Sequence, residues 1–161
     1  MNGKLLLLGL GNDILCDDAV GLRVAEAVRE RLVGRTNVAV IQSAEMGLAL
    51  LDLIVGFDTL LIVDAVRTNQ AKPGFVHEVE GDDLKKLPMI SPHFLGVGEA
   101  LALGRELGLR MPDKVKIFAV EVQDPFTVST QMTPAMEEAL PEIIGRVTRE
   151  VSCLAVGPAS A

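Results

Sequence analysis

Three segments of the sequence contain residue types that bind divalent metal ions. The segment GLGNDILCDDAVG carries the adjacent acids Asp17 and Asp18. The segment TLLIVDAV is apolar until Asp64, and the segment ISPHFLG contains His93. Two carboxylates and a neutral imidazole form a mixed oxygen and nitrogen ligand set. Such a set suits a borderline divalent ion such as nickel, zinc or cobalt.

The elements expected around these residues bring them to one edge of a sheet. Asp64 closes an apolar strand, and ligands of open α/β sheets bind outside the carboxyl ends of the strands. The first and third strands are usual neighbours in such sheets, so an acid from the turn after the first strand meets Asp64. The spacing leaves open whether Asp17 or Asp18 points inward. Ser91-Pro92 favours a helix start that places His93 in the first helical turn.

Each of these residues also has a purely structural interpretation. Either acid of the first segment can cap a helix and complement its dipole. Asp64 can hydrogen-bond a loop, and a lone histidine such as His93 is often an ordinary surface or core residue. The conjunction of the three favours a metal site, because neighbouring carboxylates repel each other unless a cation binds.

Other chemistries fit the sequence less well. The first segment has isoleucine where the dinucleotide fingerprint requires its third glycine, and no Lys-Ser/Thr pair of a phosphate loop follows. Only two histidines are present, which excludes a three-histidine zinc site within this chain, and His77 lies in a strand pattern. Ser91 lacks a nucleophile-elbow motif, and Cys16 is interpreted as a small apolar residue at a turn.

Hydrophobic patterning predicts an α/β fold, a three-layer sandwich with helices on both faces of a largely parallel, twisted sheet of about five strands. The short link RTNQAKPG makes the third and fourth strands an antiparallel or irregularly connected pair. Four helices are expected, and their approximate ranges are 20–32, 47–55, 93–107 and 133–153. Pro141 is expected to kink or split the last helix.

Composition limits the partners and the compartment. The formal net charge of −7 disfavours nucleic acid and anionic membranes. No segment resembles a secretory signal or a transmembrane span, and the two cysteines form no disulfide pattern, so we expect a cytoplasmic protein. The length predicts a single domain over residues 1–155, with a flexible tail at 156–161.

The motifs GLGNDILCDDAVG, LLIVDAV, SPHFLG and MTPAMEEAL, taken in this order, resemble those of the hydrogenase maturation endopeptidases. The similarity covers nearly the whole chain. In that family the second acid of the first motif, the strand-end aspartate and the helix-start histidine form the metal site. By position, the resemblance assigns Asp18, Asp64 and His93 as both the metal-binding and the catalytic residues, and it selects Asp18 over Asp17.

The resemblance implies an endopeptidase that removes a C-terminal extension from the [NiFe] hydrogenase large-subunit precursor once nickel is inserted. Nickel would be supplied by the substrate and recognised through Asp18, Asp64 and His93. Residues 42–46 (QSAEM) replace a glycine-rich turn that is common among relatives, which bears on precursor choice. Two alternatives are a non-enzymatic nickel-binding maturation module and a peptidyl-tRNA hydrolase, whose fold also begins with a GLGN turn. The second would need a basic groove and an early histidine.

Overall fold

The computed structural model describes residues 3–80 and 96–155, and its central element is a five-stranded sheet. The strands are β1 (Leu5–Leu10), β2 (Val38–Ser43), β3 (Thr59–Val66), β4 (Val76–Glu80) and β5 (Lys114–Glu121). Their order is β2-β1-β3-β5-β4. β1 pairs with β2 and β3, and β3 pairs with β5, all in parallel; only β4 is antiparallel, at the edge beside β5. The predicted neighbours β1 and β3 are confirmed.

The link between β3 and β4 is irregular. The two strands do not pair with each other, because β5 lies between them. The chain therefore crosses the end of β5 before it returns as the antiparallel edge strand β4. Of the two links expected from the sequence, the irregular one is the one observed.

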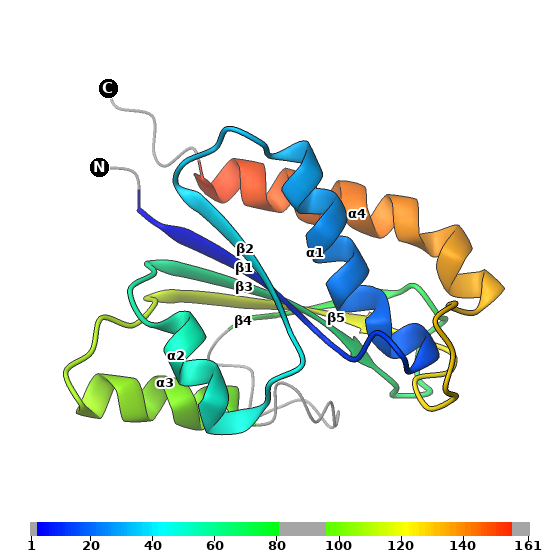
Figure 1. Cartoon of the computed structure of the whole chain (residues 1–161), viewed down its shortest axis with the longest axis horizontal. Helices are drawn as coiled ribbons and strands as arrows, with labels where there is room; N and C mark the ends of the chain where they lie inside the picture. The colour runs from blue at the N-terminus through cyan, green and yellow to red at the C-terminus, as the bar shows by residue number, and fades with distance from the viewer. Residues whose placement is uncertain (1–2, 81–95, 156–161) are drawn as a thin grey trace.

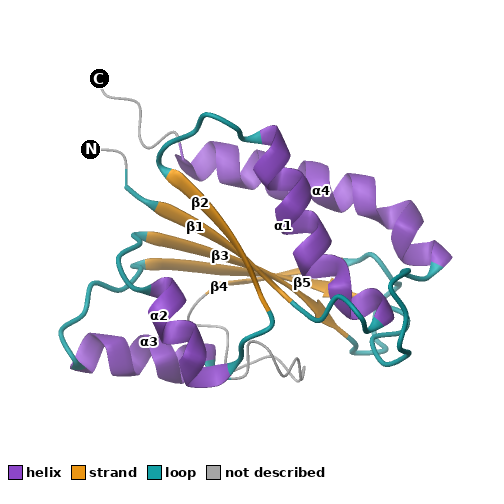
Figure 2. Ribbon diagram, in the orientation of Figure 1, coloured by secondary structure: helices purple, strands orange, loops and turns teal. Residues whose placement is uncertain are grey.

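Helices cover both faces of the sheet, which confirms the predicted three-layer α/β fold (Figures 1 and 2). The helical elements are η1 (Cys16–Ala19), α1 (Val20–Arg31), η2 (Gly47–Leu50), α2 (Leu51–Ile54), α3 (Val97–Glu106) and α4 (Pro134–Ala155), where η denotes a 3₁₀ turn. α1 and α4 lie on one face, and η2, α2 and α3 lie on the other. No helix within residues 3–80 and 96–155 is long and apolar enough to cross a membrane.

Alternating side chains of the strands divide the core into two layers. In β3, Leu61, Val63 and Ala65 pack toward α1 and α4, whereas Leu60 and Ile62 pack toward α2 and α3. This is the period-two alternation of a strand that is buried on both faces. The helix expected at 20–32 packs on the first of these layers through Val20, Val24 and Val28, which are fully buried.

Pro141 was expected to kink or split the last helix, and the expected split is wrong. α4 continues as one helix from Pro134 to Ala155 with Pro141 inside it. Buried apolar side chains lie on both sides of the proline, including Met136, Leu140 and Ile143. Their packing on the sheet offsets the cost of a proline within a helix, which is about 3 kcal/mol.

Two glycines allow α1 to lie directly on the sheet. A methyl group built on Gly9 of β1 would lie 2.4 Å from the carbonyl oxygen of Gly21 in α1. A methyl group built on Gly21 would lie 2.4 Å from the carbonyl oxygens of both Leu10 and Val63. The helix and the strands β1 and β3 are therefore in backbone contact at this point, which only glycine permits.

We predict that Gly21→Ala destabilises the fold by about 2–3 kcal/mol, because the new methyl group overlaps two strand carbonyls. Urea unfolding followed by circular dichroism measures this change. Gly145→Ala is the matched control, because Gly145 also lies inside a helix and the nearest atom to its added methyl group is an Arg149 side-chain nitrogen at 3.4 Å. The control should be neutral or more stable by up to about 1 kcal/mol. Equal effects of the two substitutions would refute the close-packing argument.

Candidate active site at the carboxyl edge of the sheet

The carboxyl ends of β1, β3 and β5 meet at one edge of the sheet, because the three strands are parallel neighbours. The turn after β1 contains η1, which contacts β3. The loop that follows β5 returns to this turn: the amide of Cys16 donates to Ser129 O at 2.9 Å, and the amide of Asp17 donates to Asp124 O at 2.9 Å. Figure 1 shows these loops gathered beside the start of α1.

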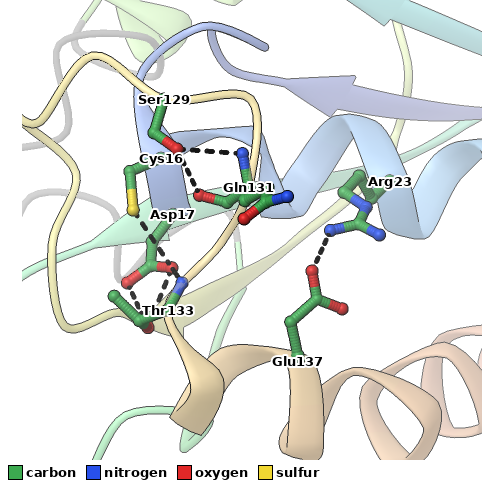
Figure 3. A network of polar contacts seen from close by, with 7 residues as sticks. All are labelled: Cys16, Asp17, Arg23, Ser129, Gln131, Thr133 and Glu137. Carbon is green, nitrogen blue, oxygen red and sulfur yellow. Dashed lines mark hydrogen bonds and ion pairs between the residues drawn. The ribbon is translucent and has the colours of Figure 1, made fainter.

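Asp17 is fully buried within a network of hydrogen bonds (Figure 3). Its carboxylate accepts from the amides of Gln123 at 3.1 Å and Asp124 at 2.8 Å. It also accepts from the Thr133 amide at 2.8 Å and from the Thr133 hydroxyl at 3.0 and 2.9 Å. These bonds satisfy the buried charge and join η1 to the residue before α4.

The hydroxyl of Thr133 thus bonds to Asp17 directly before α4 begins at Pro134. Nearby, Arg23 of α1 and Glu137 of α4 form an ion pair at 2.6 Å, also visible in Figure 3. The two helices are thus linked by polar contacts at the end of the sheet where the predicted site lies.

Asp18 lies beside Asp17 and has a different environment. Its side chain holds the turn after β1, because the amide of Asn12 donates to Asp18 Oδ2 at 3.0 Å. The turn is closed further by the amide of Ile14, which donates to Asn12 Oδ1 at 3.2 Å. Asp18 is 8% exposed, whereas Asp17 has no exposed surface. The two adjacent acids therefore occupy different positions relative to solvent.

Asp64 lies on β3 at the same edge and is fully buried. The amide of Ala65 donates to Asp64 Oδ1 at 2.8 Å. Strand alternation places Asp64 on the face that carries α2 and α3. Val63, the residue before Asp64, contacts the backbone of Gly21. Gly21 is three residues after Asp18 in the sequence. The structure thus brings Asp18 and Asp64 to one edge, as the sequence predicted.

His93, the third predicted site residue, lies outside the described residues, as does the predicted tail at 156–161. The chain resumes at Gly96, which lies against Gly47: a methyl group built on Gly96 would be 3.0 Å from Gly47 Cα. Within residues 3–80 and 96–155, no group of three His, Cys, Asp or Glu side chains is placed to hold a metal ion.

Glu121, a buried acid that the sequence analysis did not single out, ends β5 at this edge and is 1% exposed. The amide of Thr68 donates to Glu121 Oε2 at 2.8 Å, and the Thr68 hydroxyl donates to Oε1. His77 Nε2 lies 3.1 Å from Oε1, so this histidine of β4 helps to hold the Glu121 carboxylate. The sequence could have identified Glu121, because an acid at the end of an apolar strand is the same pattern that identified Asp64.

The environments of two ionisable groups are consistent with structural roles. Burial raises the pKa of Glu121, but hydrogen bonds from Thr68, His77 and Asn69 outweigh it, so the pKa lies below its usual range. Burial, together with the charge of Asp17, raises the pKa of the Cys16 thiol. A buried thiol with a raised pKa is a weak nucleophile, in agreement with the interpretation of Cys16 as a small apolar residue.

We predict that Glu121→Gln destabilises the protein by about 1–3 kcal/mol at neutral pH, because hydrogen bonds to a buried carboxylate are lost or weakened. A carboxyl group whose pKa is depressed by folding stabilises the protein above its unfolded pKa and loses this effect as the pH falls. The difference between the variant and the parent should therefore shrink as the pH is lowered from 7 toward 3 in urea titrations. A constant difference would contradict this assignment.

Comparison with known proteins agrees with the resemblance seen in the sequence. The family model described as hydrogenase maturation protease matches residues 22–150. The hydrogenase 2 maturation protease of Escherichia coli (strain K12) is 31% identical over 146 residues, which cover 85% of this chain and 88% of that protein.

Solved structures give the same result. The hydrogenase maturating endopeptidase HybD from E. coli superposes with a TM-score of 0.80 at 26% identity, covering 92% of each chain. The [NiFe] hydrogenase maturation protease HybD from Thermococcus kodakarensis shares the fold, with a TM-score of 0.70 at 22% identity over 94% of this chain and 99% of that one. The family model and the E. coli relatives together establish that this chain belongs to the hydrogenase maturation proteases.

Proposed function

We propose that this endopeptidase removes the C-terminal extension of a [NiFe] hydrogenase large-subunit precursor after nickel insertion, and that Asp18, Asp64 and His93 bind the nickel held by that precursor. The observation that carries the proposal is the position of Asp18 and Asp64. Two carboxylates from separate segments lie at one edge of the sheet, 8% and 0% exposed. Such a pair is a natural ligand set for a cation.

The contacts of Asp17 support the choice of Asp18. The carboxylate of Asp17 accepts hydrogen bonds from three residues and has no exposed surface. Binding an ion through Asp17 would require these bonds to break, which leaves buried donors without partners at a cost of about 1–3 kcal/mol each.

His93 is proposed as the third ligand because the resemblance assigns the histidine of the SPHFLG motif to the metal site, together with Asp18 and Asp64. A neutral imidazole beside two carboxylates gives the mixed nitrogen and oxygen set that suits nickel.

The chemistry of an incomplete ligand set suits an ion that arrives with the substrate. One imidazole and two carboxylates leave coordination positions for ligands of the precursor, so the nickel can be shared. Binding would then depend on whether the precursor carries nickel. For hydrolysis, water adds to the scissile carbonyl carbon, a carboxylate takes a proton from that water, and the leaving amine is protonated as the C–N bond breaks.

The two alternative functions are less well supported. A non-enzymatic nickel module does not explain membership in a protease family. A peptidyl-tRNA hydrolase would need a basic surface for RNA, and the net charge is −7. We also propose that the protein works in the cytoplasm and that residues 1–155 form one domain, as the sequence predicts.

We predict that Asp18→Ala, Asp64→Ala and His93→Ala each abolish processing of a nickel-loaded precursor and retain the circular dichroism spectrum of the parent. Cleavage is read by mass spectrometry of the large subunit. The matched control is Asp13→Ala, which removes an exposed acid from the same turn and should process normally. Full processing by any of the three site variants would remove that residue from the assignment.

We further predict that the isolated enzyme retains little metal, because three ligands bind an ion weakly without those of the precursor. Elemental analysis after purification without added nickel tests this expectation. The precursor with nickel should bind more tightly than the nickel-free precursor, and the difference should vanish in Asp64→Ala. A stoichiometric nickel content in the isolated enzyme would contradict substrate-supplied nickel.

A further inference from the structure

Three large apolar side chains are exposed at the edge of the sheet that carries the candidate site. Ile14 is 51% exposed, Phe126 is 69% exposed and Val128 is 76% exposed. Ile14 belongs to the turn after β1, and the other two belong to the loop after β5. We refer to these three residues as the apolar shelf. Exposed apolar groups that gather on one surface are typical of interaction sites.

Hydrogen bonds hold the two loops of the shelf together. The amide of Ser129 donates to Ile14 O at 2.9 Å, and the amide of Cys16 donates to Ser129 O at 2.9 Å. Asp124 Oδ1 accepts from the amides of Phe126 at 2.9 Å and Thr127 at 3.0 Å. The apolar side chains are therefore presented to solvent by an ordered backbone, and a partner would pay little ordering entropy on binding.

The shelf adjoins the turn that carries Asp18. Ile14 lies in this turn, which Asp18 closes through the Asn12 amide. The guanidinium of Arg67, in the segment that follows β3, lies 5.6 Å from the centre of the Phe126 ring. A polypeptide whose scissile bond lies at Asp18 would therefore reach the shelf with its neighbouring residues.

We propose that the apolar shelf binds apolar side chains of the precursor polypeptide next to the scissile bond; this inference rests on the function proposed above. An endopeptidase must hold its substrate beside the cleavage point, and the turn that presents Ile14 is the turn that Asp18 closes. A second copy of this chain is a poorer occupant, because each copy carries a net charge of −7 and the two would repel each other.

The test compares two double variants. Phe126→Ser/Val128→Ser removes two of the three apolar side chains of the shelf. Leu107→Ser/Val33→Ser is the control, since Leu107 and Val33 are exposed to 62% and 83% at the opposite end of the sheet. We expect the shelf variant to raise the KM for the nickel-loaded precursor about tenfold with kcat unchanged, as for the loss of uniform binding. The control should stay within about twofold of the parent.

Binding without cleavage separates the shelf from the proposed chemistry. Each double variant is combined with Asp18→Ala, and the Kd for the precursor is measured by calorimetry. A roughly tenfold weaker Kd for the shelf variant than for the control supports the shelf. Equal Kd values overturn it, even if the parent enzyme cleaves normally.

Three further outcomes are informative. Cleavage by Asp18→Ala would refute the site assignment and leave the shelf supported by its own Kd difference. A parent enzyme that neither binds nor cleaves the precursor would overturn the shelf and the proposed function together. A parent dimer in sedimentation velocity that dissociates in Phe126→Ser/Val128→Ser would assign the shelf to a second copy and overturn the proposal.

Discussion

The buried carboxylate of Asp17 is the contact on which the arrangement of the site edge depends. It accepts hydrogen bonds from the loop that follows β5 and from the residue before α4, while its own backbone amide donates back to that loop. One side chain of the first segment thus joins two later segments, each more than 100 residues further along the chain. A charge with no exposed surface tolerates this position only because each partner is in place.

The glycines of the first motif also position the edge of the sheet that carries the candidate site. A turn of the form GLGN suggests a phosphate loop, yet Gly9 here brings the backbone of α1 into contact with β1. Gly21 has the corresponding role against β1 and β3. Gly11 lies under the carbonyl of Asp18, where a methyl group would approach the oxygen to 2.2 Å. The small residues therefore set the distance between helix and sheet, and with it the position of the acids.

The adjacent acids Asp17 and Asp18 look equivalent in the sequence but have different roles in the structure. Asp17 holds loops together, and Asp18 closes the turn after β1 at a position with some exposure. Glu121, at the end of β5, also has a structural role like that of Asp17, because its carboxylate holds the segment that begins at Thr68. Structural acids thus surround the proposed site, and the proposed shelf extends from the loops that they hold.

Much of the fold could be read from the sequence, because apolar runs and helical stripes are local patterns. The apolar run TLLIVDAV was predicted as a strand, although Asp64, expected to close it, lies two residues before its end. The first helix was predicted close to its observed range, Val20–Arg31. The insertion of β5 between β3 and β4 could not be read in this way, because strand order depends on contacts between distant segments. The continuity of α4 through Pro141 likewise depends on how both halves of the helix pack on the sheet.

For the candidate site, the sequence by itself determined which residue types are available: acids after β1, an acid within β3 and a histidine before α3. It also determined the family, because the order of the motifs is specific. Only the tertiary structure decided that Asp17 is engaged by Gln123, Asp124 and Thr133, and that Ile14 and Phe126 emerge on neighbouring loops. The reason is physical: burial and hydrogen bonding of a side chain are set by segments that meet only when the chain folds.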